Sequence, residues 1–269
     1  MNWNGIRARD ERSDRKSNGR LVTKVVFFRL FDPQFGAFLT YLLFTCFLAV
    51  PVTAGAQSVC SSDGQAKPLQ LVERFIDADC LTCWNSSTQT EARASPERPS
   101  DLTLDWIVPS AKGEDAALSV AATRDATQRL QHLKRVLNAP QLTVRSSAGQ
   151  QPLRVARGFA LNGYMGASIE LKLPKTSPLR QQTLTAWLLL VQEISAGTEG
   201  SPIARLLVRN TLVTTWTPAQ SNNPDTQRLL ESRPMSLPES GNPDQMRVVG
   251  WVEDASGRLL SVASSRCMP

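Results

Sequence analysis

The sequence contains a single histidine, His132, and only two tyrosines in 269 residues. With His132 as the one available base, Ser–His and Cys–His catalysis are disfavoured. His132 lies between two leucines in a helical pattern, which predicts a packing or surface role, and no second histidine could share a metal ion. The chain also lacks a glycine-rich phosphate loop, a zinc-protease motif and an internal repeat. These absences argue against nucleotide-binding, metalloprotease and repeat-protein classes.

Charged and aromatic residues give no further catalytic pattern. Four acidic residues have no spacing typical of acid–base work and are expected in solvated loops: Asp101, Asp105, Glu114 and Asp115. Five tryptophans are expected in the core or at an interface: Trp84, Trp106, Trp187, Trp216 and Trp251. No metal site and no cofactor are therefore predicted.

The first 56 residues have the order of a secretory signal peptide. A basic segment of about thirty residues precedes an apolar run, residues 35–50, and the small-residue triplet Ala54-Gly55-Ala56 follows. The apolar run has 16 residues, whereas a bilayer span needs about 20. Residues 1–56 are thus predicted to be a cleaved signal peptide, with a retained membrane anchor as the alternative. A start codon further in, near Leu21, is a second open possibility.

Export changes the charge of the chain. The first 56 residues hold eight Lys or Arg and four Asp or Glu, so they carry four of the six formal positive charges. The remaining 213 residues are nearly neutral, which gives no support to nucleic-acid binding. We expect a periplasmic or extracellular protein that has no stable membrane insertion once the signal peptide is cleaved.

Four cysteines remain after the odd fifth, Cys46, is removed with the signal peptide. An even number in an exported chain indicates two disulfides, for which three pairings exist. Cys80 and Cys83 form the natural local pair, which leaves Cys60 with Cys267 as a structural clasp between the two ends. Such a clasp contributes roughly 4–5 kcal/mol in the chain-entropy model. A four-cysteine zinc site is the alternative, although Cys60 and Cys267 lack the usual close spacing.

Alternating strand and helix patterns fill the first part of the exported chain. Residues 69–76 and 102–108 are rich in apolar residues, as buried strands are, and residues 139–144 form a strand that starts at a proline. A helix capped by Thr123 or Asp125 is expected to continue to about Leu137, with one apolar face. This order predicts an α/β unit over residues 57–148.

Beyond about residue 150 the patterns favour β-structure. Strands are expected at residues 169–173, 184–194 and 203–216, with a closing hairpin over 246–253 and 258–266. The Pro- and Ser-rich residues 217–245 are expected to be a mobile connection. Residues 149–269 are therefore predicted to be an antiparallel, sandwich-like domain, so the whole fold is of the α+β class.

The Cys80-Leu81-Thr82-Cys83 motif is the feature that can carry chemistry. It follows a predicted strand and opens a helix, which is the context of a redox-active dithiol. A helix N-terminus stabilises a thiolate on the first cysteine and so lowers its pKa. The Cys80 thiolate would attack a substrate disulfide, and Cys83 would resolve the mixed disulfide that forms. Pro140 is the candidate for a cis proline that places backbone groups beside the sulfurs.

Residues 71–83 (LVERFIDADCLTC) and 139–144 (APQLTV) resemble a family of secreted thioredoxin-like proteins of unknown function, the domain of unknown function 1223. The segments 193–200 and 209–212 also resemble that family. The resemblance implies a thioredoxin-like fold with a CxxC motif for residues 57–148. Two departures stand out: Trp84-Asn85 replaces the Pro-Pro of the family after the second cysteine, and Leu81-Thr82 lies between the cysteines.

Two functions stay open on this evidence. The first is a thiol–disulfide oxidoreductase that acts through Cys80 and Cys83 on thiols or disulfides of other exported proteins. The second is a non-catalytic, exported binding or envelope-associated module in which the CxxC disulfide is structural. Asp79, beside Cys80, opposes thiolate formation by like-charge repulsion and so favours the second function.

Overall fold

The computed structural model describes residues 60–86, 101–218, 226–239 and 241–267. The predicted signal peptide lies outside these residues. Within the described ranges, no helix combines the length and apolar character that crossing a membrane would take.

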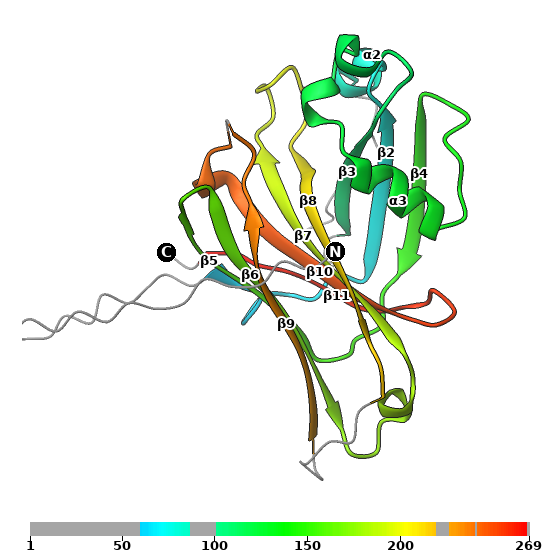
Figure 1. Cartoon of the computed structure of the whole chain (residues 1–269), viewed down its shortest axis with the longest axis vertical. Coiled ribbons are helices and arrows are strands. Elements are labelled where there is room, and N and C mark those ends of the chain that lie inside the picture. The colour runs from blue at the N-terminus through cyan, green and yellow to red at the C-terminus, as the bar shows by residue number, and fades with distance from the viewer. Residues whose placement is uncertain (1–59, 87–100, 219–225, 240, 268–269) are drawn as a thin grey trace, which may run out of the picture. The chain divides into compact units, whose positions relative to one another are not determined.

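The described residues are mostly β-structure, arranged in two sheets with few helices (Figure 1). The smaller sheet has the strand order β1-β5-β6-β9 and is antiparallel. Its strands are β1 (Cys60–Ser61), β5 (Leu153–Leu161), β6 (Tyr164–Pro174) and β9 (Thr226–Ser236). The larger sheet has the order β11-β10-β7-β8-β3-β2-β4 and is mixed, because β3 runs parallel to both of its neighbours.

A β–α–β–α–β unit at one end of the larger sheet carries the CxxC motif. In chain order it comprises β2 (Gln70–Asp77), α2 (Leu81–Trp84), β3 (Leu102–Val108), α3 (Arg124–His132) and β4 (Gln141–Ser147). The central strand, β2, pairs in parallel with β3 and antiparallel with β4. The strand–helix alternation expected for this part of the chain is therefore present.

The other strands of the larger sheet come from the C-terminal half. They are β7 (Leu184–Ile194), β8 (Arg205–Trp216), β10 (Met246–Asp254) and β11 (Leu259–Ser264). The predicted domain boundary at residue 148 falls between β4 and β5, yet this one sheet takes strands from both sides of it. Strand β3 joins the two sets through its pairing with β8.

The two sheets pack face to face around an apolar core from β5, β6, β7, β10 and β11. Gly250 on β10 allows the close approach. A Cβ atom there would meet Val155 Cγ1 at 2.8 Å and Ile169 Cδ1 at 2.9 Å, both from the smaller sheet. Glycine is needed at this position because any side chain would push the sheets apart.

Helices α2 and α3 cover opposite faces of the larger sheet. Phe75 on β2 packs in one cluster with Leu130 of α3, whereas the next residue, Ile76, packs in another with Trp84 of α2. Successive side chains of a strand point to opposite faces, so this alternation places the two helices. Two short 3-10 turns, Gly113–Asp115 and Ser119–Ala121, precede α3.

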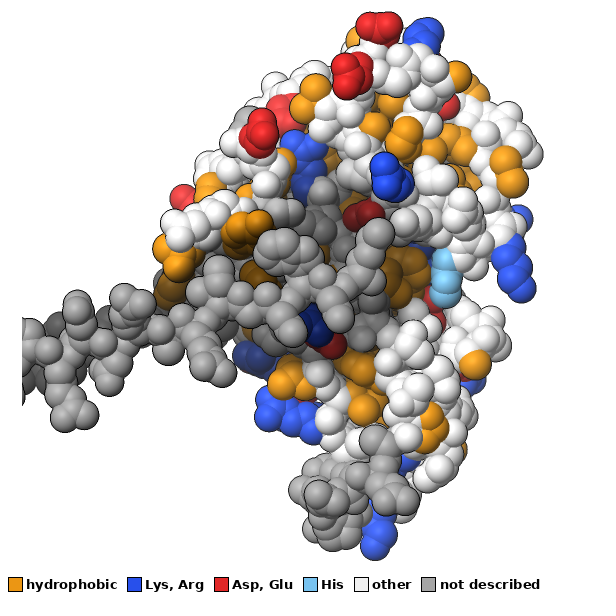
Figure 2. All heavy atoms as spheres, viewed as in Figure 1, with side chains coloured by type: hydrophobic (Ala, Val, Ile, Leu, Met, Phe, Trp, Pro, Cys, Tyr) orange, Lys and Arg blue, Asp and Glu red, His pale blue; other side chains and the backbone are white. Residues whose placement is uncertain are grey.

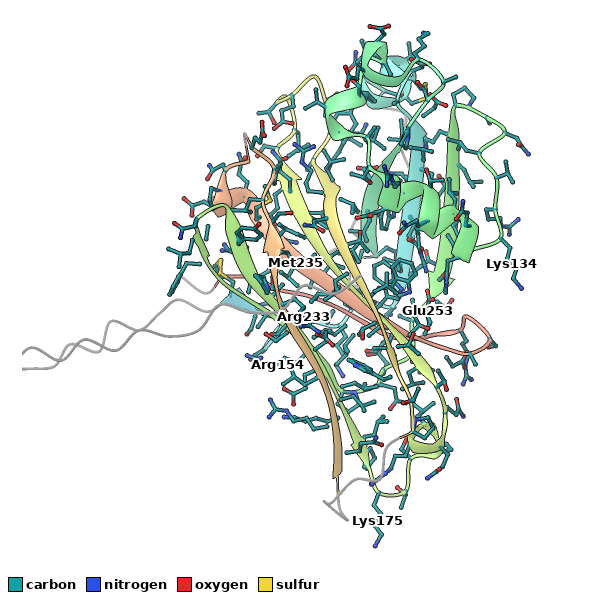
Figure 3. All side chains as sticks on the ribbon, in the orientation of Figure 1. Lys134, Arg154, Lys175, Arg233, Met235 and Glu253 are labelled. Atoms are coloured by element: carbon teal, nitrogen blue, oxygen red, sulfur yellow. A yellow bond between two sulfur atoms is a disulfide. The ribbon has the colours of Figure 1, made fainter. Side chains whose placement is uncertain are left out.

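Helix α3 ends at His132, five residues before the predicted end. The Arg135 N–H bonds to Leu130 O and the Lys134 N–H to Gln131 O, which is the Schellman pattern of a helix terminus. Lys134 has a φ of 53° at the position that usually holds glycine, and its side chain points away from the sheet (Figure 3). The stop therefore carries no glycine signal in the sequence.

The predicted mobile connection over residues 217–245 is wrong for its central part. Strand β9 lies there and pairs with β6 along eleven residues, including Pro234 opposite Gly166. A proline is tolerated because β9 is the edge strand of the smaller sheet, where a missing N–H breaks no ladder. Strand β5 was also not predicted, whereas the closing hairpin, β10 and β11, is present as expected.

Candidate functional site

Cys80 and Cys83 form a disulfide at the start of α2, immediately after the central strand β2. Cys80 is the N-cap residue, and its Sγ atom accepts the Cys83 backbone N–H at 3.2 Å. The Thr82 hydroxyl lies 3.4 Å from the same sulfur. Both cysteines are half-buried. In a reduced protein these two donors would face a Cys80 thiolate and stabilise its charge.

Pro140 lies beside this disulfide. Its carbonyl oxygen is 3.8 Å from Cys83 Sγ and also accepts the Asp77 N–H at 3.0 Å. The described residues contain no cis peptide bond, so the Ala139–Pro140 bond is trans and the candidate Pro140 is not a cis proline. The backbone of Pro140 nevertheless reaches the sulfurs, because β4 pairs with β2 and so begins next to α2.

A shallow depression of about 480 Å³ opens in front of Cys80. Its lining residues are Asp77, Asp79, Cys80, Thr82, Leu137, Asn138, Ala139 and Pro140. Lys112 Nζ lies 3.4 Å from Asp79 Oδ1 and offsets part of the negative charge. Acidic side chains also gather at the α2 end of the molecule (Figure 2). The surface around the disulfide is thus acidic, with the apolar Leu81 exposed beside it.

Residues of the C-terminal half hold α2 in place. Trp84 is buried, and its indole Nε1 donates to Glu199 O at 2.7 Å. Arg205 Nη2 donates to Trp84 O at 2.6 Å, and the Arg205 guanidinium lies 4.5 Å from the centroid of the Trp84 ring. Glu199 belongs to the β7–β8 connection, and Arg205 begins β8. The position of the CxxC motif therefore depends on residues more than a hundred positions away.

A buried ion triad supports Arg205. Arg74 donates to both carboxylate oxygens of Asp105 at 2.6 Å, and Arg205 Nη1 lies 3.4 Å from Asp105 Oδ2. Asp105 is 0% exposed, so its expected place in a solvated loop is wrong. Burial lowers the pKa of Arg205, and the Asp105 carboxylate opposes that effect. One carboxylate between two guanidinium groups fixes β2, β3 and β8 relative to one another.

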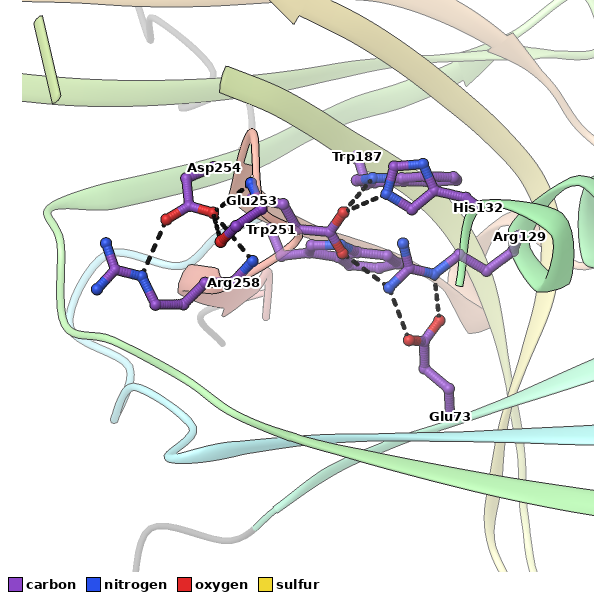
Figure 4. A network of polar contacts seen from close by, with 9 residues as sticks. Glu73, Arg129, His132, Trp187, Trp251, Glu253, Asp254 and Arg258 are labelled. Carbon is purple, nitrogen blue, oxygen red and sulfur yellow. Dashed lines mark hydrogen bonds and ion pairs between the residues drawn. The ribbon is translucent and has the colours of Figure 1, made fainter. Parts of the chain in front are cut away.

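A second buried network joins α3 to both halves of the larger sheet (Figure 4). Arg129 donates to Glu73 at 2.9 and 2.8 Å, and its Nη2 also lies 2.8 Å from Glu253 Oε1. All three side chains are less than 5% exposed. Burial by itself would lower the pKa of Arg129, but the two carboxylates raise it above the usual value.

Aromatic residues enclose this network. The Arg129 guanidinium lies 4.5 Å from the Trp187 ring centroid and 4.9 Å from that of Trp251. Both indole N–H groups donate to Glu253, at 3.2 Å from Trp187 and 3.0 Å from Trp251. His132 Nε2 lies 2.7 Å from Glu253 Oε2. The packing role expected for the histidine and the tryptophans thus includes holding the buried carboxylate of Glu253, as the dashed contacts in Figure 4 show for His132 and Trp187.

Sequence reasoning missed both networks, although a signal was present. Glu73 and Arg74 stand within an otherwise apolar strand, as does Asp105 within β3. Charged residues are rarely buried unless paired, so a charge inside an apolar strand indicates a partner elsewhere. The partners themselves, Arg129 and Arg205, belong to other elements and could not be identified from the strand pattern.

Cys60 and Cys267 form the second disulfide, across a sequence separation of 207 residues. Cys60 is 3% exposed and lies in β1, whereas Cys267 is exposed. Arg157 Nη2 donates to Cys267 Sγ at 3.1 Å. The four sulfurs are therefore paired as two disulfides rather than gathered for zinc. In the part of the chain that the structure describes, no group of three or more potential His, Cys, Asp or Glu ligands is present.

Comparisons with known proteins give limited similarity. No protein-family model and no curated protein matches the chain. A crystal structure of the Agrobacterium tumefaciens protein AGR_C_4864 is similar over 76% of this chain and 96% of that one, with 11% identity and a TM-score of 0.40. HBP35 of Porphyromonas gingivalis is similar over 76% of each chain, with 10% identity and a TM-score of 0.44.

Proposed function

We propose that this protein is a thiol–disulfide oxidoreductase that acts through Cys80 and Cys83 on thiols or disulfides of other exported proteins. The observation that carries the proposal is the half-exposed Cys80–Cys83 disulfide at the start of α2, after strand β2, with Pro140 O against one sulfur. The CxxC motif in a thioredoxin-like unit supports it, together with the resemblance of residues 71–83 to secreted thioredoxin-like proteins.

The exchange chemistry requires only these two cysteines. A substrate thiolate attacks Cys80 Sγ, forms a mixed disulfide and expels the Cys83 thiolate. A second thiolate of the same substrate then attacks the substrate sulfur of the mixed disulfide and releases Cys80. The substrate is thereby oxidised, and the protein is reduced by two electrons. The reverse sequence reduces a substrate disulfide. The Cys83 N–H and the Thr82 hydroxyl stabilise Cys80 as the leaving thiolate.

The alternative is a non-catalytic, exported binding or envelope-associated module with a structural CxxC disulfide. The acidic lining of the depression favours it, because the carboxylates of Asp77 and Asp79 disfavour the negative charge of a Cys80 thiolate. Lys112 counters only Asp79. The two functions therefore differ in one measurable property, the reduction potential of the Cys80–Cys83 pair.

That potential can be measured by equilibrating the full chain in glutathione buffers of defined ratio. The free thiols are then alkylated, and the reduced fraction of each cysteine pair is determined by mass spectrometry. An oxidoreductase is expected to have a potential between about −270 and −120 mV, the range of known dithiol oxidoreductases. A value below about −300 mV would show a structural bridge and contradict the proposal. Cys60–Cys267 serves as the internal reference and is expected to stay oxidised.

Export to the periplasm or the extracellular space is part of the same proposal. Its support comes from the order of basic, apolar and small residues in positions 1–56 and from the even cysteine count that follows. Cell fractionation of a tagged full chain tests it. Protein that is shortened near Ala56 and found outside the cytoplasm is the expected result, and full-length cytoplasmic protein would contradict it.

A further inference from the structure

A cavity of about 240 Å³ lies beside the Cys60–Cys267 disulfide and shares no lining residue with the depression at the CxxC motif. We call it the clasp cavity. Its lining residues are Cys60, Arg157, Glu193, Asp244, Met246, Arg247, Ser265, Arg266 and Cys267. They come from both sheets, since β1 and β5 belong to the smaller one and β7 and β10 to the larger one. A volume of this size corresponds to about eight water molecules and so fits a small organic molecule.

Arg157 is unusual among the lining residues because its charged side chain is almost buried; the residue is only 8% exposed. It donates to Cys267 Sγ and to Gly158 O, at 3.1 and 3.4 Å, but its Nε has no hydrogen-bond partner among the described residues. Nor does any described carboxylate form an ion pair with it. Burial lowers the pKa of Arg157, and only the more distant Asp244 opposes this. A buried guanidinium without a carboxylate is costly, and an anion would relieve that cost.

Two further arginines add positive charge. Arg247 pairs with Glu193, whereas Arg266 is exposed and forms no ion pair in the part of the chain that the structure describes. Burial and then repulsion from Arg266 lower the pKa of Arg247 to about 10. The cavity wall therefore has three guanidinium groups against two carboxylates, and two of those guanidinium groups repel each other.

A neighbouring cavity of about 400 Å³ shares Glu193, Arg247 and Arg266 with the clasp cavity. Its other arginines, Arg74 and Arg205, already share the buried Asp105, and an additional acidic residue, Asp101, lines it. Among the described arginines that line the two cavities, Arg157 and Arg266 form no ion pair; Arg157 lines the clasp cavity alone, whereas Arg266 lines both.

We propose that the clasp cavity binds a small anion bearing carboxylate or phosphate oxygens, held by the forked donors of Arg157 and Arg266. Guanidinium groups match both kinds of oxygen pair with two parallel hydrogen bonds. Binding is coupled to the disulfide, because the guanidinium of Arg157 that contacts the anion also contacts Cys267 Sγ. The site does not depend on the proposed function of Cys80 and Cys83.

The test is isothermal titration calorimetry on the full chain with both disulfides formed, using citrate and, separately, inorganic phosphate at constant ionic strength. Binding of one or both is expected, and the anion bound tells carboxylate from phosphate chemistry. Arg266→Gln is expected to raise the Kd about tenfold, since it removes a charge-assisted contact. The matched control is Arg228→Gln, which alters an exposed arginine on β9 and should leave the Kd unchanged.

Arg157→Gln is expected to weaken binding similarly and is scored where circular dichroism shows an intact fold. Because Arg266 is exposed, its variant decides the question alone. No binding of either anion by the wild-type protein, or equal Kd values for Arg266→Gln and wild type, would overturn the proposal.

A second measurement follows from the contact between Arg157 and Cys267. Saturating anion is expected to slow the reduction of Cys60–Cys267 by dithiothreitol several-fold, without slowing that of Cys80–Cys83. Equal slowing at both disulfides would indicate a general effect on the fold and would count against binding at the clasp.

Discussion

Arg129 on α3 donates two hydrogen bonds to Glu73 on β2, from Nε to Oε1 at 2.9 Å and from Nη2 to Oε2 at 2.8 Å. The same guanidinium contacts Glu253 on β10, which belongs to the C-terminal half. The helix is thereby tied to the strand that leads into the CxxC motif and to a strand four places away in the sheet. Packing alone would leave these elements free to slide, whereas a forked ion pair fixes their relative position.

Arg129→Met is expected to destabilise the protein by about 3–5 kcal/mol, because it leaves Glu73 and Glu253 buried without their cation. Urea unfolding followed by circular dichroism measures the change. Arg124→Met is the matched control, since Arg124 is exposed at the start of the same helix, and its effect should be below about 0.5 kcal/mol. Equal effects of the two substitutions would show that the buried network contributes little.

Arg205→Met is expected to loosen α2, because it removes the hydrogen bond to Trp84 O and the guanidinium above the Trp84 ring. We expect a loss of about 2–4 kcal/mol in stability and faster reduction of Cys80–Cys83 by dithiothreitol. Arg205→Lys keeps the charge but lacks the planar guanidinium, so its stability and its reduction rate should lie between those of the wild type and Arg205→Met. An unchanged reduction rate in Arg205→Met would contradict the role assigned to Arg205.

Removal of the two disulfides should have unequal effects on stability. Cys60 and Cys267 are 207 positions apart, whereas Cys80 and Cys83 are 3 apart. In the chain-entropy model, replacing the first pair by alanine costs about 5 kcal/mol and replacing the second about 2 kcal/mol. Urea unfolding of the two double variants checks the order. The reverse order would mean that the CxxC disulfide is the more important structural bridge.

The pH dependence of stability should include a contribution from Glu170. The hydrogen bond from Arg228 lowers the pKa of Glu170 below 4.5, burial opposes it, and Lys172 adds to the lowering. A depressed folded-state pKa stabilises the fold above about pH 4.5, and this contribution is lost as the pH falls through the folded-state value.

Arg228→Gln is therefore expected to lower the free energy of unfolding at about pH 7 and to lower it by less at about pH 3, because Glu170 becomes protonated as the pH falls. Lys175→Gln is the control, because Lys175 forms no ion pair among the described residues. Urea unfolding at both pH values gives the comparison. A deficit of Arg228→Gln that persists at low pH would show that Glu170 is not its cause.

Local signals in the sequence led to the residues around Cys80. The spacing of Cys80 and Cys83 after an apolar strand predicted the position of the disulfide, and the proline before the next strand predicted a contact beside it. These features lie close along the chain or follow from one strand pairing. The isomer of the Pro140 bond is not encoded in that pattern, and only the structure shows that this bond is trans.

Other features were hidden because their cause is tertiary. Strand β9 contains a proline and polar residues, a composition that predicts a connecting loop. It can nevertheless pair with β6, because an edge strand tolerates a proline. Helix α3 ends at a Schellman motif that has lysine in place of the usual glycine. Because the apolar periodicity continues past this point, the sequence pattern predicts a longer helix.

By itself, the sequence determined the strand–CxxC–helix order, the two cysteine pairs and the seven strands of the larger sheet, because these depend on spacing and alternation. Only the tertiary structure decided which charges meet. Strand β8 inserts between β7 and β3, out of chain order, and brings Arg205 to Asp105 and Trp84. The energy of a buried charge depends on the partner that strand order places beside it, and that order is set by the whole fold rather than by any local segment.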